Sequence, residues 1–168
     1  VSHLNGEIYA HKPPLLFWLI NAVWSVTGVH EITGRLVVPV LSLCSVLLTR
    51  RMAQLIWNGN SVAADSAAVI HCSGMLWMLI SQLTMFDVLL TFSVQISLLG
   101  LLQMEQSVSV PTPERRMKYV PLIPGTLMLG LGMGLGILSK GPVILLHVLP
   151  VSVLGFVWSD RVRVQAGR

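Results

Sequence analysis

Titratable side chains are concentrated in one short stretch that ends in a pair of prolines. Residues 3–12 contain two histidines, a carboxylate, a phenol and a lysine, and an apolar run follows from Pro13. Proline lacks the N–H that a first helical turn cannot use, so Pro13 and Pro14 suit the start of a helix. Lys12 precedes a proline and is therefore expected to be extended. Its ammonium would stand at the boundary between water and lipid, where it can meet an anionic headgroup.

The composition sets the protein class. Of the 168 residues, 54% are hydrophobic and 11% are charged, and the mean hydropathy is +0.75. Soluble domains carry about 25% charged residues, so the long apolar runs indicate an integral membrane protein whose partners include membrane lipids. Basic and aromatic residues are not interleaved, and nucleic acid is not an expected partner.

The apolar runs predict an all-α, polytopic helix bundle that forms one membrane domain over residues 1–168. An N-terminal helix over 13–29 either lies in the membrane interface or crosses the bilayer. It belongs to an outer-face segment, 1–35, and a cytoplasmic tail covers 159–168. About five transmembrane helices fill 36–158, at 36–57, 62–83, 88–104, 119–138 and 143–158.

Basic residues predict the orientation of these spans. If the spans alternate from the first one, one side receives eight basic residues and should be cytoplasmic: Arg50, Arg51, Arg115, Arg116, Lys118, Arg161, Arg163 and Arg168. The other side receives only Arg35 and Lys140, together with Glu31 and Asp87. Topology does not explain these few charges.

Several polar groups keep an ordinary structural interpretation. Lys140 ends a span, where a lysine is commonly an interface anchor, and Asp87 can cap the helix over 88–104. Asp65 is expected to be an interface charge near Arg50, and His71 to hydrogen-bond within the core. Glycines at alternate positions in the fourth span form two overlapping small-xxx-small pairs that predict a packing seam: Gly130, Gly132, Gly134 and Gly136.

Four segments, in order, resemble bacterial GT-C glycosyltransferases. The run from His3 to Leu19, with its Lys-Pro-Pro, is similar to the segment before their second transmembrane helix. Further matches lie at 31–36, 85–92 and 135–143. The resemblance is to the aminoarabinose (lipid A) transferase branch of the protein O-mannosyltransferase-like superfamily, and it implies that this bundle is part of a GT-C fold.

The resemblance implies a reaction and a site. Such enzymes move a sugar from a polyprenyl-phosphate carrier to a lipid A, protein or other envelope acceptor, on the outer face of the bacterial inner membrane. It implies that Lys12 contacts the phosphate, with Arg35 and Lys140 as further candidates. Asp87 would support this site, and Tyr9 would bind substrate. His11 occupies a position that is commonly acidic in the family, which leaves a divalent metal there an open question.

The family places its catalytic aspartate in a loop after a first transmembrane helix, upstream of the match to residues 3–19. The isolated chain is therefore expected to be inactive as a transferase. A non-catalytic, truncated remnant remains an alternative, as does a transporter or scaffold. A transporter would carry ionisable groups near the bilayer midplane, whereas here the charges cluster at the ends of the spans.

Overall fold

The computed structural model describes residues 3–4, 7–8, 13–74, 86–107 and 122–155. Two short strands pair antiparallel, β1 (His3–Leu4) and β2 (Glu7–Ile8), with His3 opposite Ile8. The remaining elements are helices: α1 (Leu15–Thr27), α2 (Glu31–Ile56), α3 (Ser61–Ser73), α5 (Phe86–Ser107), α6 (Leu122–Lys140) and α7 (Val143–Val153).

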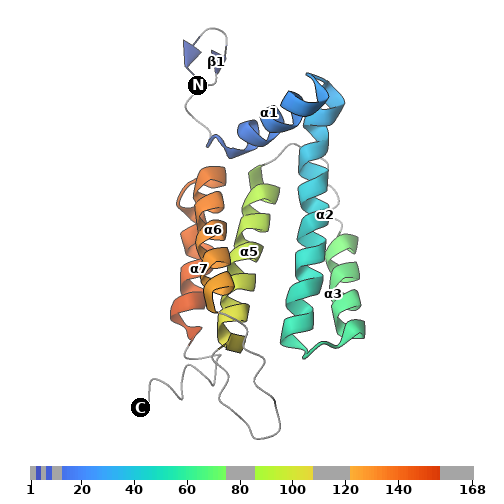
Figure 1. The fold of residues 1–168 in the computed structure, drawn as a ribbon, viewed down its shortest axis with the longest axis vertical. Helices are drawn as coiled ribbons and strands as arrows, with labels where there is room; N and C mark the ends of the chain where they lie inside the picture. The colour runs from blue at the N-terminus through green and yellow to red at the C-terminus, as the bar shows by residue number, and fades with distance from the viewer. Residues whose placement is uncertain (1–2, 5–6, 9–12, 75–85, 108–121, 156–168) are drawn as a thin grey trace, which may run out of the picture.

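The longer helices lie side by side, and α1 crosses them at one end (Figure 1). Helices α2 and α5 begin at this end, α6 ends there, and α7 begins there. We call it the α1 end, and the end where α2 passes into α3 the opposite end. The described part of the chain is therefore helical apart from the two short strands, as the sequence predicts.

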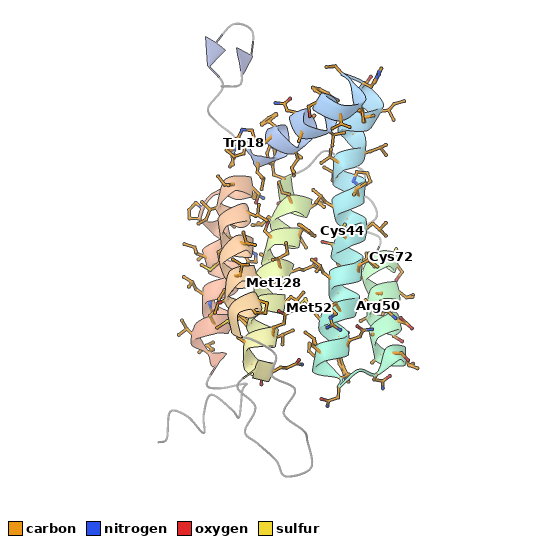
Figure 2. The ribbon with its side chains drawn as sticks, in the orientation of Figure 1. Trp18, Cys44, Arg50, Met52, Cys72 and Met128 are labelled. Atoms are coloured by element: carbon orange, nitrogen blue, oxygen red, sulfur yellow. The ribbon has the colours of Figure 1, made fainter. Side chains whose placement is uncertain are left out.

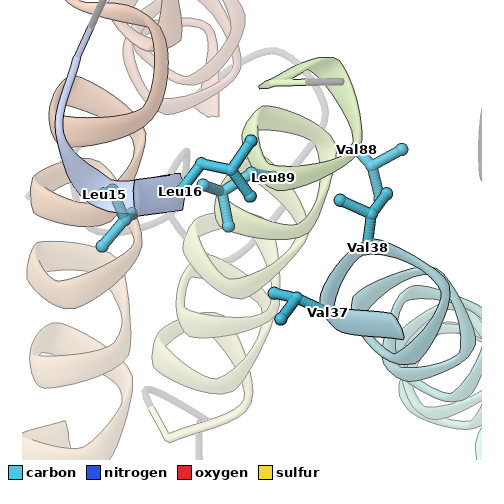
Figure 3. Close-up of a cluster of buried hydrophobic side chains, with 6 residues drawn as sticks. All are labelled: Leu15, Leu16, Val37, Val38, Val88 and Leu89. Atoms are coloured by element: carbon cyan, nitrogen blue, oxygen red, sulfur yellow. The ribbon is translucent and has the colours of Figure 1, made fainter. Parts of the chain in front are cut away.

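Helix α1 is short and packs on the bundle most deeply through its first turn, with Leu19, Ile20 and Val23 packed against the same cluster. Its 13 residues extend for about 20 Å, less than the hydrocarbon core of about 30 Å. Leu15 and Leu16 are buried in one cluster with residues of α2 and α5, where Val38 of α2 lies next to Val88 of α5 (Figure 3). Both the length and the direction of α1 favour an interfacial helix over a span.

Small residues set the distance between α5 and α6. A Cβ added to Gly100 would lie 2.6 Å from Gly125 O, and one added to Gly132 would lie 2.7 Å from Ser93 O. Ile144 of α7 fills the space at Gly136. By contrast, no heavy atom lies within 4 Å of a Cβ at Gly130 or Gly134. One of the two predicted glycine pairs therefore forms the packing seam, and the other faces outward.

Two described helices, α2 and α5, are long and apolar enough to cross a membrane. The expected total of about five spans stays a prediction. Residues 31–35, which the sequence places in the outer-face segment ahead of the first span, form the first turns of α2, because Glu31 suits a helix N-terminus and pairs with Arg35 one turn later. Helix α7 ends at Val153, and the expected span over 62–83 runs beyond α3 into residues outside the described ranges.

Candidate functional site at the α1 end

An ion pair joins the start of α5 to the end of α6. Asp87 is the second residue of α5, and Lys140 is the last residue of α6. Lys140 Nζ donates a hydrogen bond to Asp87 Oδ1. The side chains remain 43% and 51% exposed for Lys140 and Asp87, respectively. Both charges are therefore open to a ligand that approaches this end of the bundle.

The turn between α6 and α7 fixes the position of Lys140. Ser139 is fully buried and donates from Oγ to Gly136 O at 2.9 Å. Gly141 adopts φ +72° and donates its N–H to Ile137 O at 2.8 Å, which closes the C-terminus of α6. Lys140 is thus held at a helix C-terminus, where a cation is favoured by the partial negative charge of the helix dipole.

The position of Asp87 differs from the expected helix cap. Because α5 begins at Phe86, Asp87 lies within the first turn, and its carboxylate reaches across to Lys140. An acidic side chain in a first turn also favours the helix dipole. The sequence singled out both residues, and the structure brings them together across 53 positions of sequence.

Hydrophobic side chains flank both members of the ion pair along the chain. The rings of Phe17 in α1 and Phe86 in α5 meet edge to face, with centroids 6.0 Å apart and planes at 62°. Val88 and Leu89 follow Asp87 in the chain and are buried in the cluster beneath α1 (Figure 3). Ile137, three residues before Lys140 on α6, is 46% exposed, so one exposed apolar side chain lies a helical turn from the lysine.

Arg35 lies at the α1 end but pairs within its own helix. Its Nη2 lies 2.6 Å from Glu31 Oε1, and both side chains are about three-quarters exposed, at 73% and 75%. The corner that leads into α2 is held by Trp24, whose Nε1–H donates to His30 O at 2.9 Å. The Trp24 ring packs on Gly34, where a Cβ would come within 3.1 Å.

The remaining predicted site residues, Tyr9, His11 and Lys12, lie outside the described residues. Their roles stay predictions. Within the described ranges, the structure has no group of three or more histidine, cysteine or acidic side chains that could hold a metal ion. A divalent metal at His11 therefore stays a prediction.

The opposite end carries a second interhelical ion pair. Arg50 in α2 donates from Nε to Asp65 Oδ1 in α3 at 2.6 Å, and Arg50 lies on the side of α2 that faces α3 (Figure 2). This contact confirms the prediction that Asp65 lies near Arg50. It also supplies a comparison for the pair at the α1 end, because both pairs join two helices and both remain partly exposed.

Three polar side chains meet inside the bundle, and the sequence predicts a hydrogen bond for only one of them. Thr49 Oγ1 in α2 lies 2.6 Å from His71 Nδ1 in α3 and accepts from Gln95 Nε2 in α5 at 3.0 Å. The prediction of a core hydrogen bond for His71 is confirmed, but its partners were missed. The available signal was the polarity of Thr49 and Gln95 within apolar runs, since such groups seek partners in lipid.

The α1 end can hold an anion and orient a hydroxyl. An ammonium supplies three hydrogen-bond donors, of which the contact with Asp87 uses one, and a carboxylate supplies acceptors only. Charge-assisted hydrogen bonds of this kind are the strong ones in proteins. The exposed side chain of Ile137, one turn from Lys140, suits a ligand that joins a charged group to an apolar chain.

Comparisons with known proteins agree with the sequence resemblance. The sequence profile of a family described as "Dolichyl-phosphate-mannose-protein mannosyltransferase" matches residues 11–165. An uncharacterized protein of Aquifex aeolicus (strain VF5) is 29% identical over 69 residues, which are 41% of this chain and 14% of that protein. This chain therefore spans a small part of that relative. No solved structure matches the present chain.

Proposed function

The chain belongs to the dolichyl-phosphate-mannose-protein mannosyltransferase family, and from this we propose that it is part of a membrane glycosyltransferase. The proposed donor is a sugar linked to a polyprenyl phosphate. The observation that carries the proposal is the exposed Asp87–Lys140 pair with the exposed Ile137 one turn from the lysine, since a polyprenyl phosphate also joins one charged group to a long apolar chain. We also propose that residues 1–168 form a single membrane domain of the GT-C type.

In the proposed reaction, an acceptor hydroxyl oxygen forms a bond to the anomeric carbon of the sugar, and its proton passes to the catalytic aspartate that the resemblance places upstream of residues 3–19. The bond between that carbon and the phosphate oxygen breaks, and its electron pair stays on the phosphate. Negative charge therefore develops on the leaving phosphate, and a cation placed beside it stabilises the transition state. We assign Lys140 and Lys12 to this task, with Arg35 as a further contact.

The other site residues receive supporting roles in this proposal. Asp87 orients Lys140 through their ion pair, and Tyr9 contacts the substrate. His11 is the proposed metal ligand, if a divalent metal takes part. The proposed acceptor is lipid A, a protein or another envelope component, because the motifs of this chain resemble those of the aminoarabinose (lipid A) transferase branch.

We further propose a multi-pass protein of the bacterial inner membrane, with the α1 end on the outer face. The basic residues that precede α3, Arg50 and Arg51, lie at the opposite end of α2 from Arg35. This separation agrees with the tendency of basic residues to stay in the cytoplasm. The active side would then face the periplasm or the exterior.

Phosphate binding tests the proposed role of Lys140. The chain is placed in lipid nanodiscs, and its affinity for farnesyl phosphate, a short polyprenyl phosphate, is measured by calorimetry beside uncharged farnesol. Lys140→Gln is expected to weaken farnesyl phosphate binding by about tenfold or more, because a hydrogen bond to a charged group contributes about 1.5–3 kcal/mol. Farnesol binding should not change.

Arg50→Gln is the matched control, because it removes one cation from an interhelical ion pair at the opposite end. It should leave farnesyl phosphate binding at the wild-type level. Equal affinities for the wild type and Lys140→Gln would show that Lys140 does not contact the phosphate. The proposed site would then be wrong.

A further inference from the structure

Both cations that the structure describes at the α1 end already have a carboxylate partner. Lys140 pairs with Asp87, and Arg35 pairs with Glu31. An anion that reaches Lys140 therefore meets a negative charge beside the positive one. We propose that Asp87 competes with phosphate for Lys140 and so promotes release of the polyprenyl phosphate product. This inference rests on the proposed function and assigns Asp87 a role beyond holding the lysine in place.

The geometry allows this competition. Lys140 and Asp87 are each about half exposed, and an exposed ion pair contributes little to stability, so its partners exchange readily. One ammonium nitrogen can bind a carboxylate oxygen and a phosphate oxygen at once. Two oxygens that share one nitrogen lie about 5 Å apart, given hydrogen bonds of about 2.8 Å and tetrahedral donors. The phosphate and the carboxylate would therefore be close neighbours.

The charge of the phosphate changes during the proposed reaction. The donor is a phosphodiester with one negative charge. When the bond to the sugar breaks, its electron pair stays on the phosphate oxygen, and the product is a monoester with a second pKa of about 6. The product is thus close to a dianion above neutral pH. Lys140 alone would hold this product more tightly than the donor, which would slow the next cycle.

The carboxylate of Asp87 acts against that preference. In a medium with the dielectric constant of water, a unit charge about 5 Å away changes the affinity of a monoanion about fourfold. The same charge acts on a dianion with twice the energy, so the factor becomes about fifteenfold. Asp87 should therefore weaken the binding of both phosphates, and it should weaken the binding of the monoester more.

Two farnesyl ligands that differ by one methyl group test the inference. Farnesyl phosphate is the monoester and farnesyl methyl phosphate is the diester, and both are titrated into the whole chain in nanodiscs at pH 8. Asp87→Asn, which keeps the size of the side chain, is expected to tighten the diester about fourfold and the monoester about fifteenfold. Asp87→Glu keeps the charge and should stay near the wild-type affinities for both ligands.

Two controls separate this effect from a general change in charge. Asp65→Asn frees a cation at the opposite end, and Ser25→Lys adds one to the exposed face of α1, about 14 Å along that helix from Leu16. Each should alter either affinity by less than about twofold, because salt screens charges at such distances.

Weaker phosphate binding in Asp87→Asn would show that Asp87 only positions Lys140, and unchanged binding would show that the two groups do not compete. Either result overturns the inference. A gain in phosphate affinity in Ser25→Lys as large as that in Asp87→Asn would also overturn it. A failure of the proposed function looks different, because Lys140→Gln would then bind farnesyl phosphate as well as the wild type does. Tightening in Asp87→Asn that disappears in the double variant with Lys140→Gln supports both proposals.

Discussion

The packing seam between α5 and α6 predicts opposite outcomes for two nearby alanine substitutions. In Gly132→Ala, the new Cβ would lie 2.6 Å from Ser97 N and 2.7 Å from Ser93 O. These are backbone atoms of a packed helix, so α5 and α6 must move apart. In Gly134→Ala, the new Cβ meets nothing within 4 Å. The two sites lie two residues apart on α6, and they differ in what faces them.

The magnitude follows from two opposing terms. Overpacking of a close contact costs about 1–3 kcal/mol, whereas replacing glycine by alanine within a helix gains up to about 1 kcal/mol. Gly134→Ala receives only the gain and should be neutral or stabilising. Gly132→Ala receives both terms. Because the helical term is common to the two variants, their difference in unfolding free energy isolates the steric term, about 1–3 kcal/mol.

Unfolding in mixed micelles with increasing SDS, followed by far-UV circular dichroism, measures this difference. Gly130→Ala serves as a second control, since its site is also open. Equal unfolding free energies for Gly132→Ala and Gly134→Ala would refute the close approach of α5 and α6 at this point. A more stable Gly132→Ala would mean that the helices pack through the other glycine pair.

Two further predictions address the interior and the orientation. Thr49→Val removes the hydroxyl that bonds both His71 and Gln95. It should lower the unfolding free energy in mixed micelles by about 1–2 kcal/mol, because each such bond contributes roughly 0.6 kcal/mol in a membrane protein. An unchanged unfolding free energy would show that these contacts contribute nothing. In a variant without native cysteines, Ser25→Cys should react with a membrane-impermeant maleimide that is added to intact spheroplasts. Asn58→Cys should react only after the spheroplasts are lysed. The reverse pattern would invert the proposed orientation.

The sequence identified the residues of the α1 end but not their pairing. Asp87 and Lys140 stand out because each is a lone charge at the end of an apolar run. Their contact depends on the register between α5 and α6, which hydropathy does not contain. That register follows from small residues: Gly100 meets Gly125, and two turns closer to the α1 end Ser93 meets Gly132. About two turns beyond lies the Asp87–Lys140 pair.

The errors in the predicted elements have a similar origin. The sequence places residues 31–35 ahead of the first span, because hydropathy counts Glu31 and Arg35 as interruptions. Within a helix the same two residues lie one turn apart and form an ion pair, so they support the first turns of α2 instead. The glycine repeat in α6 likewise predicted a seam without its direction, since only the position of α5 and α7 decides which pair is covered.

The stability of the bundle and the chemistry of its α1 end can therefore be separated. An ion pair as exposed as Asp87–Lys140 contributes about 0–1 kcal/mol in water, too little to hold two helices in register. The close packing along Gly100, Gly125 and Gly132 can do so, because those contacts are between backbones. The seam places the two charges together without depending on their attraction. Lys140 can then exchange Asp87 for a phosphate while α5 and α6 stay where they are, as competition between the two anions requires.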